Sequence, residues 1–360
     1  MSPEKPKPMS DERRFVRRVL IVLGLTSLFL LAWFLRTLVL MLFGALVVAT
    51  VFRAFADRIC KLTGWRTGIG TAISITLIVG LSLALIALFG THVVQQVQSL
   101  REMLPAAWRA VEARMGDLGL GEQLKRWAED IRAPGGSSFS AFGRTILSIG
   151  SGIADVLVVL VAGIFLATQP RFYLAGAVKL VPAGKRPLAL EAITESERAL
   201  RLWLRGQLIA MLVVGLLTGF GLWMLGMTSA FTLGLLAGVL EFIPFAGPIL
   251  SMIPAVLLAL AVSPDLALWV LLLYFAVQQF EGYLLTPLVQ QYAVDLPGVV
   301  LLFALIAFGA LFGTLGVILA APLTVVSYVL VKRLYVIETL HTPTPIPGTD
   351  EPASHTSIKA

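Results

Sequence analysis

Long apolar runs separated by short polar segments follow one another along most of the chain. A membrane-spanning helix needs about 20 apolar residues to cross about 30 Å of hydrocarbon. Only Leu35 and Arg36 separate the first two runs, which predicts a tight pair of spans. Five runs come near the required length and predict a polytopic helical membrane protein: residues 19–34, 37–52, 69–89, 146–167 and 208–225.

Two later runs are too long for single straight spans. Residues 231–262 form 32 residues with one charge, Glu241, and residues 298–331 form 34 residues with none. As straight helices they would measure about 48 and 51 Å, more than ordinary tilt absorbs. With residues 266–283 as a span between them, the chain is predicted to be an all-α polytopic membrane protein with about eight nominal spans.

Helix-breaking residues lie in the middle of both long runs. Proline removes a backbone donor and clashes with the preceding turn, and non-helical backbone at membrane depth needs protein or a wet cavity around it. We therefore expect two broken helices or helical hairpins. The breaking residues are Pro244, Gly247, Pro248 and Pro254 in the first run, and Gly309, Gly313, Gly316 and Pro322 in the second.

The two breaks resemble copies of one design. Residues 247–254 and 316–322 each begin with glycine and end with proline, with a one-residue difference in spacing. Paired broken segments of this kind indicate the substrate site of a transporter. Glycine and proline are also common in membrane helices generally, so coincidence stays open as the alternative.

The other segments complete the organisation of the chain. Apolar positions recur at helical spacing in the exported part, which is typical of packing on its own spans, on a neighbouring subunit or at the membrane interface. Within a cytoplasmic helix, Ile193, Leu200 and Leu204 are expected to face the membrane. In order, we predict a basic cytoplasmic arm (1–18), three spans (19–91), an exported amphipathic segment (92–145), a transport core (146–334) that contains the cytoplasmic helix 188–204, and a disordered cytoplasmic tail (335–360).

Composition and charge agree with a membrane location. The chain is 58% hydrophobic and 14% charged, whereas soluble domains are about 45–50% apolar and about 25% charged. The net charge of +7 comes from basic residues beside apolar runs, which indicates cytoplasmic loops and not a nucleic-acid partner. Basic residues in 53–66, 171–205 and at Lys332–Arg333, with the basic arm, predict that both termini are cytoplasmic in a multi-pass inner membrane protein.

The residue types and motifs disfavour a cofactor-binding protein and an enzyme. The single Cys60 excludes an internal disulfide and a cysteine-based metal site. His92, His341 and His355 are far apart in the sequence, so no metal or other cofactor is expected. The chain has no His-Glu-x-x-His, Gly-x-Ser-x-Gly or Gly-x-x-x-x-Gly-Lys motif, which disfavours an enzyme and ATP-driven transport.

A series of motifs in residues 146–334 resembles the autoinducer-2 exporter family. The series comprises Trp203-Leu-Arg-Gly-Gln207, Leu233-Gly-Leu-Leu-Ala-Gly238, Phe242-Ile-Pro-Phe-Ala-Gly-Pro248, Ile253-Pro-Ala255, Glu281-Gly282, Pro287, Leu296-Pro297, Leu311-Phe-Gly313, Gly316 and Ala321-Pro322. Glu241 departs from the pattern, since a small polar residue such as Asn is expected there. The resemblance implies a secondary-active or facilitated exporter, with some members linked to autoinducer-2 and quorum sensing and others to exchange of sodium or lithium for protons. It also implies a homo-oligomer, with a pentamer as one form, in which one domain moves against a fixed scaffold.

Ionisable groups inside the bilayer are costly and are therefore functional candidates. Glu241 could titrate and couple solute movement to a proton or sodium, or it could cap backbone donors freed by the prolines. Glu281 ends the next span beside Gln278 and Gln279, where a place near the membrane interface is an equal alternative to a functional role. Asp155 lies about 16 Å into its span by helical rise, where helix packing is an equal alternative to a functional role.

The remaining candidates are polar or shape the backbone. Arg205 could neutralise a carboxylate, bind an anionic solute or extend to the lipid headgroups. Glycines and prolines at the breaks would expose backbone N–H and C=O groups to a ligand. The predicted substrate or ion pathway consists of Glu241, Pro244, Gly247, Pro248, Glu281, Gln278, Gln279, Gly313, Gly316, Arg205, Gln207 and Asp155.

The patterns favour a carrier of a small molecule or ion, with an autoinducer-2-like solute as the leading candidate. A sodium or lithium/proton antiporter is the first alternative, followed by a passive channel, since broken helices also build selectivity filters. A non-transporting scaffold ranks next and an enzyme last. The residues leave open the coupling ion, the direction of transport and whether 231–262 and 298–331 cross the membrane or turn back.

Overall fold

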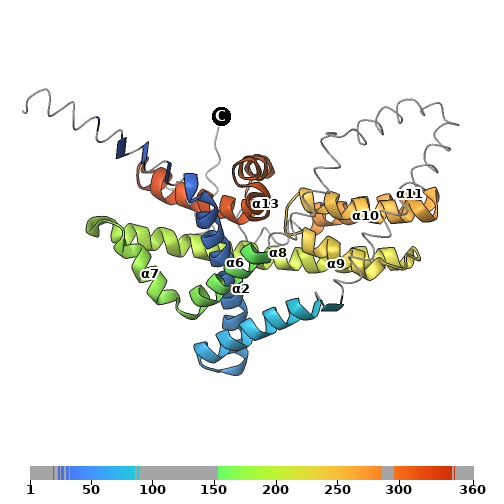
Figure 1. The fold of residues 1–360 in the computed structure, drawn as a ribbon, viewed down its shortest axis with the longest axis horizontal. Helices are drawn as coiled ribbons and strands as arrows, with labels where there is room; N and C mark the ends of the chain where they lie inside the picture. The colour runs from blue at the N-terminus through green and yellow to red at the C-terminus, as the bar shows by residue number, and fades with distance from the viewer. Residues whose placement is uncertain are drawn as a thin grey trace, which may run out of the picture.

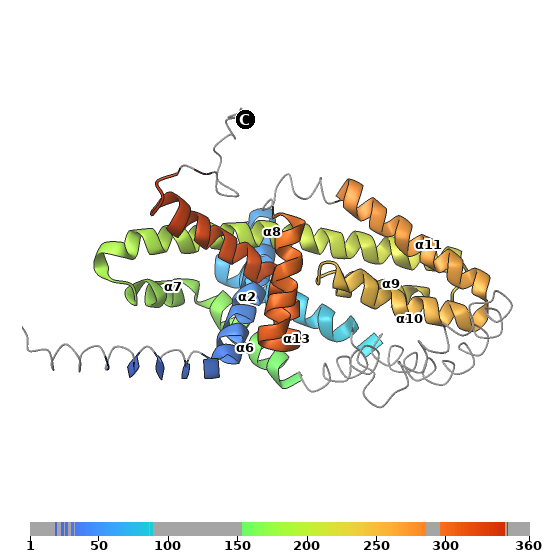
Figure 2. The same ribbon diagram turned by 90° about the horizontal axis from the view of Figure 1, so that it is seen from above.

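The computed structural model describes residues 33–85, 153–285 and 296–342, with a few single residues beside these ranges. Every regular element in these ranges is helical (Figures 1 and 2). Five of the described helices are long and apolar enough to cross a membrane. The prediction of an all-α polytopic membrane protein is therefore confirmed. The exported segment 92–145 and the basic arm 1–18 lie outside the described residues, and the first predicted span, 19–34, is described only in part.

The first two predicted spans do not form a tight pair. The N–H of Leu35 donates to the carbonyl of Leu31, and the N–H of Val39 donates to the carbonyl of Leu35, at 2.9 and 3.0 Å. Because this is the α-helical bonding pattern, the chain passes Leu35 without reversing and continues into α2 (Arg36–Thr63). The predicted reversal at Leu35–Arg36 is wrong, because neither residue prevents helical hydrogen bonding.

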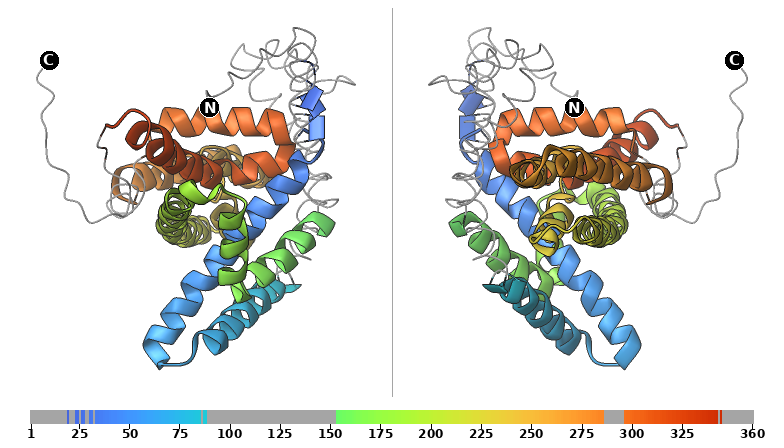
Figure 3. Two further views of the ribbon diagram at one scale, coloured as in Figure 1. Left: turned by 90° about the vertical axis from the view of Figure 1, so that its left-hand side faces the viewer. Right: turned by 90° about the vertical axis from the view of Figure 1, so that its right-hand side faces the viewer.

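Three helices pack into one unit of the fold. α2 packs closely on α6 (Ile153–Thr168), where a Cβ at Gly163 would meet the side chain of Val48 at 2.8 Å. The next helix, Thr67–Leu85, is joined to α2 by a 2.7 Å hydrogen bond from the Ser74 hydroxyl to the Phe52 carbonyl. Figure 3 shows α2 and this helix diverging from a short turn. A bend of 92° after α6 leads into α7 (Pro170–Lys179).

A single 39-residue helix, α8 (Arg186–Met224), contains both the predicted cytoplasmic helix 188–204 and the fifth predicted span. It follows a 3-10 turn, Ala183–Lys185. Leu200 and Leu204 are only 4% and 2% exposed and pack in a cluster with residues of α2 and the C-terminal helix. The expectation that they face the membrane is therefore wrong, because other helices of the same chain cover this part of α8.

The run 231–262 is divided into two antiparallel helices, α9 (Ala230–Leu240) and α10 (Ala246–Val262). At 1.5 Å per residue, α9 is only about 16 Å long and cannot cross the hydrocarbon alone. α11 (Pro264–Phe280) then returns beside α10 and continues as a π-helix, Glu281–Leu285. α8, α9, α10 and α11 share a core at one end of this bundle, formed by Leu222, Met227, Ala230, Leu233, Ala255, Ala259, Ala267, Val270 and Tyr274.

The last long helix, α13 (Gly298–Val331), is interrupted at Gly313, whose φ of 66° and ψ of −146° are not helical. Two limbs of different direction result (Figure 2). A π-helix, Lys332–Ile337, follows the second limb. The predicted tail 335–360 therefore begins inside a helix, and most of the tail lies outside the described residues.

Candidate functional site

The first break lies between the end of α9 and the start of α10. Pro244 has no N–H to continue the helix, and Phe245 adopts a left-handed φ of 62° and a ψ of −44°. The N–H of Ala246 donates to the Pro244 carbonyl at 2.7 Å, which closes a classic γ-turn, a rare and strained conformation. A Cβ at Gly247 would lie well under 3.0 Å from the Leu240 carbonyl oxygen. Glycine is therefore required for α10 to pack against the end of α9.

The second break, in α13, has a similar local geometry. A Cβ at Gly316 would lie well under 3.0 Å from the Phe308 carbonyl oxygen. Residues eight positions apart in a straight helix are about 12 Å apart along its axis, so this contact means that the chain doubles back at Gly313. Both breaks place a glycine against the carbonyl of a residue seven or eight positions earlier. This shared geometry supports the interpretation of 247–254 and 316–322 as copies of one design.

Both breaks approach one hydrophobic cluster in the middle of the molecule. Phe242 from the first break, and Phe312 and Leu315 from the second, pack against residues of α2, α8 and the second limb of α13. Phe245 of the first break also contacts the start of α13, since its ring lies 3.7 Å from the Cβ position of Gly298. The structure therefore brings together two segments that are about 70 residues apart in the sequence.

Glu241 is the buried acidic residue of the first break. Only 3% of its surface is exposed, and its Oε2 atom has no hydrogen-bond partner within the described part of the chain. Its carboxyl group interacts directly with the carboxyl group of Glu281. Because a charged group at this burial requires compensation, the site is suited to hold a proton or a cation. No described backbone N–H donates to this carboxyl group, so the structure gives no support to the capping alternative.

Glu281 lies where α11 changes into a π-helix. Such π-helical turns are rare and occur frequently at functional sites. The amide of Gln278, one turn earlier, donates to the Oε2 atom of Glu281. The structure therefore places Glu241, Glu281 and Gln278 together, although the break and the end of α11 are separate in the sequence.

The face of α8 that is turned toward the first break carries Gln207 and Trp203. The Nε2 of Gln207 donates to the backbone carbonyl of Glu241 at 2.6 Å. The ring of Trp203 meets the ring of Phe242 edge to face, with centroids 5.9 Å apart. Gln207 was among the predicted site residues, but Trp203 and Phe245 were not. The i, i+4 spacing of Trp203 and Gln207 was a signal that could have linked them.

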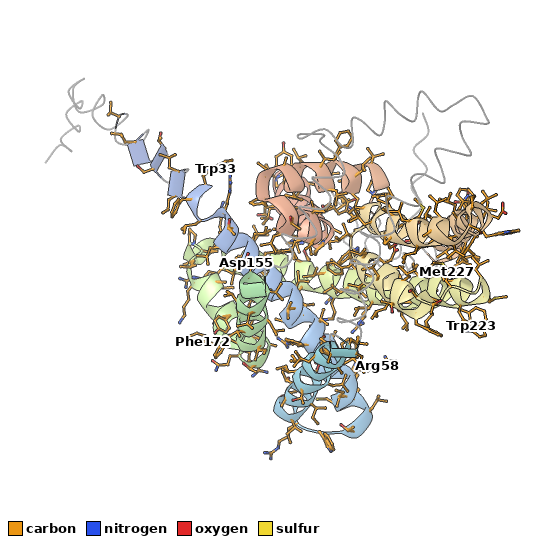
Figure 4. The ribbon with its side chains drawn as sticks, turned by 45° about the vertical axis from the view of Figure 1, so that its right-hand side comes forward. Trp33, Arg58, Asp155, Phe172, Trp223 and Met227 are labelled. Atoms are coloured by element: carbon orange, nitrogen blue, oxygen red, sulfur yellow. The ribbon has the colours of Figure 1, made fainter. Side chains whose placement is uncertain are left out.

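Three predicted site residues are not brought to this group. Asp155 lies in the first turn of α6 (Figure 4), and no hydrogen bond or ion pair among the described residues joins it to this group. Arg205 is exposed on α8, with no ion-pair partner among the residues that the structure describes. Gln279 is exposed on α11. Pro248, by contrast, lies at the break in the first turn of α10, and its carbonyl accepts a hydrogen bond from the Ser251 hydroxyl at 3.0 Å.

Comparison with known proteins identifies the family. The model of the AI-2E family transporters matches residues 22–335. The chain belongs to the AI-2E transporter family. The resemblance predicted from the motifs is therefore confirmed, and the match extends into the N-terminal spans, where the motifs were less specific.

Relatives in this family come from Bacillus subtilis and Escherichia coli. "Putative transport protein YrrI" of Bacillus subtilis is 33% identical over 162 residues, which are 45% of this chain and 46% of YrrI. "Putative transport protein YueF" of the same organism is 33% identical over 159 residues, 44% of this chain and 42% of YueF. The chain thus matches less than half the length of these two relatives. "AI-2 transport protein TqsA" of Escherichia coli is 24% identical over 321 residues, 86% of this chain and 90% of TqsA.

Proposed function

We propose that this chain exports a small polar solute across a bacterial inner membrane, by secondary-active or facilitated transport, with an autoinducer-2-like molecule as the leading candidate. The observation that carries the proposal is the buried Glu241 carboxyl at the break between α9 and α10, paired with Glu281. Membership in the AI-2E family supports transport as the activity. The name of TqsA supports the choice of solute.

The carboxyl pair provides a way to couple solute movement to protons. Two ionised carboxylates have only acceptor oxygens, so a hydrogen bond between Glu241 and Glu281 needs a proton. The break also leaves backbone groups of two half-helices without helical partners, and these can bind a polar solute. In this mechanism the pair holds a proton in one state and releases it when the solute binds or the break moves.

Uptake of labelled autoinducer-2 into inverted vesicles under an imposed proton gradient tests this function. Saturable uptake that is lost with the gradient, and that falls at least tenfold in Glu241→Gln, is expected if Glu241 is the coupling residue. Asp265→Asn is a matched control, because it removes the same charge from an exposed residue in the first turn of α11. No uptake above empty vesicles, with folded protein confirmed, would remove autoinducer-2 as the leading solute.

Sodium or lithium/proton antiport is the second candidate. Two carboxyl groups and the Gln278 amide meet at the break, and no basic residue forms an ion pair with either carboxyl in the described ranges. A site of this composition favours a cation over an anion. Adding sodium or lithium to acid-loaded vesicles tests it, since antiport predicts a saturable pH change that Glu281→Gln abolishes.

Channel and scaffold functions make different predictions for the same vesicles. A passive channel would conduct without saturation at modest gradients, whereas a carrier saturates and shows counterflow. A scaffold would be unaffected by neutral variants of Glu241 and Glu281. We favour the carrier, because a buried carboxyl pair serves no purpose that a scaffold requires and its burial is costly.

The cytoplasmic side and the assembly are also proposals. Ion pairs join α8 to Asp57 of α2 and to Arg333 after α13, so three basic segments of the chain meet at one end of the fold. By the positive-inside tendency, we assign this end, with the C-terminus, to the cytoplasm. Because the chain does not reverse at Leu35, no tight pair of spans brings the basic arm to the side of the basic end of α2, and we assign no side to the N-terminus. A homo-oligomer, with a pentamer as one form, is proposed on family resemblance alone.

A further inference from the structure

Gln207 makes a side-chain contact with the backbone of the first break. Its amide Nε2 donates to the carbonyl oxygen of Glu241 at 2.6 Å, from 34 residues earlier in the chain. In a continuous α-helix this carbonyl would accept the N–H of Phe245. However, α9 has already ended, and Phe245 has a left-handed φ. The amide of Gln207 therefore replaces the hydrogen bond that the break removes.

A second contact from the same face of α8 holds the neighbouring residue. Trp203 lies one helical turn before Gln207, and residues four apart lie on the same face of a helix. The Trp203 ring meets the Phe242 ring edge to face, an arrangement favoured for aromatic pairs. Two adjacent residues of the break, Glu241 and Phe242, are thus held by two side chains of one helix.

α8, the helix that carries Gln207, packs very closely on α9. A Cβ at Gly238 would lie 2.6 Å from the Met211 carbonyl oxygen, and a Cβ at Gly215 would lie 3.2 Å from the Gly234 carbonyl oxygen. The backbones of α8 and α9 therefore touch over about two turns. Because a shift of α8 relative to α9 would disturb these close contacts, the Gln207 amide acts as a reference point for the backbone of Glu241.

We propose that Gln207 is a positioning residue that holds the Glu241 backbone so that its carboxyl group is directed toward Glu281. The inference rests on the proposed function, in which this carboxyl couples transport. Loss of the amide leaves a carbonyl at the break without its donor, which is unfavourable for a buried polar group. The break then rearranges, and the geometry of the carboxyl pair changes with it.

The test compares Gln207→Leu, Gln207→Glu and the wild type by two measurements. The first is infrared titration of the protonated carboxyl band that disappears in Glu241→Gln, and the second is the pH profile of uptake. In Gln207→Leu, we expect the midpoints of the band and of uptake to move by about one pH unit or more. In Gln207→Glu, a protonated side chain can donate to the carbonyl, so the uptake rate returns toward the wild-type value as the pH falls. Leu212→Ala is the control, since this α8 side chain is 64% exposed.

The outcomes separate this inference from the proposed function. If the wild type takes up no solute but the Glu241 band shifts in Gln207→Leu, the proposed function fails and the positioning role stands. If both Gln207 variants fold normally and leave the band unchanged, Gln207 does not position Glu241. Absence of any Glu241-dependent band at every pH also overturns the inference. Should Gln207→Leu fail to fold, the pH-dependent recovery of Gln207→Glu decides the question.

Discussion

At the scale of single residues, backbone conformation explains why the breaks have their composition. Proline at position 244 ends helical hydrogen bonding, Phe245 takes a left-handed φ, and Gly247 allows the next helix to return against Leu240. The left-handed region costs an L-residue with a side chain about 1–2 kcal/mol. Strain of this kind persists where the surrounding structure maintains it, often at functional sites. Keeping a side chain at position 245 therefore lowers the stability of the folded chain by a measurable amount.

Phe245→Gly should be more stable than Phe245→Ala by about 1 kcal/mol, because only glycine adopts this φ without strain. Both variants remove the ring, so their difference isolates the backbone. Thermal unfolding of the two purified variants in the same detergent measures it. A higher melting temperature for the alanine variant would show that Phe245 is not strained in the membrane.

Gly247→Ala should destabilise the chain by about 3 kcal/mol or more, because the new Cβ overlaps the Leu240 backbone, which cannot move aside without separating α9 from α10. Gly176→Ala on α7 is the matched control, since a Cβ there meets nothing within 4 Å. The melting temperatures of both variants, with uptake as a second readout, check the prediction. An unchanged melting temperature for Gly247→Ala would mean that α10 does not return so closely against α9.

At the scale of elements, the contacts of α9 and α10 decide whether the run 231–262 crosses the bundle or turns back. The Tyr274 hydroxyl donates to the Ser251 carbonyl at 3.2 Å, which fixes α11 antiparallel to α10. The turns before α9 and before α11 consequently lie at the same end, around the core that contains Met227, Ala230, Ala259 and Ala267. A helical hairpin that enters and leaves on one side of the bundle satisfies these contacts, whereas a single broken crossing of the run 231–262 does not.

Asp265→Cys in a Cys60→Ser background should react with a membrane-impermeant thiol reagent added from outside. The hairpin puts Asp265, which is exposed, at the end of the bundle opposite the basic end that we propose to be cytoplasmic. Thr63→Cys in the same background should react only after permeabilisation, since it is exposed near Lys61 at the basic end of α2. The reverse labelling of the two cysteines would contradict the assigned orientation.

At the scale of the whole molecule, ion pairs connect three helices at the proposed cytoplasmic end. Arg201 of α8 pairs with Asp57 of α2 at 2.5 Å and with Glu197 of its own helix at 2.7 Å. Arg333 pairs with Glu191 and, at 3.8 Å, with Glu195. The Arg201 and Arg333 side chains are mostly buried, but Asp57, Glu197 and Glu191 are more accessible. Each of these three pairs is therefore worth about 1 kcal/mol or less. α8 thus carries both these contacts and the Gln207 contact to the break.

Arg201→Gln should lower the melting temperature by more than Arg58→Gln does. Arg201 joins two helices, whereas Arg58 is exposed on α2 (Figure 4). Arg58→Gln removes the same charge and is therefore the matched control. The difference should shrink at high salt, because salt screens partly exposed pairs. Melting curves of both variants at low and high ionic strength measure it. Equal melting temperatures at both salt concentrations would show that the Arg201 pair does not hold α8 to α2.

The sequence by itself determined the apolar spans, the positions of the breaks and the family. Proline and glycine act through the local backbone, so both breaks could be located from the residues alone. The run 298–331 was predicted with the same bounds as α13. Glu241 could be selected because a charge in an apolar run is costly wherever it lies.

Only the tertiary structure decided which residues meet. The pairing of Glu241 with Glu281, the Gln207 contact, and the covering of Leu200 and Leu204 by other helices all join segments far apart in the chain. Asp155 fitted the same sequence criterion as Glu241, but it lies on α6, and no hydrogen bond or ion pair among the described residues joins it to the Glu241 group. The physical reason is that lipid tails and neighbouring helices are equally apolar. An apolar pattern therefore shows that a face avoids water, while its partner depends on how the helices pack.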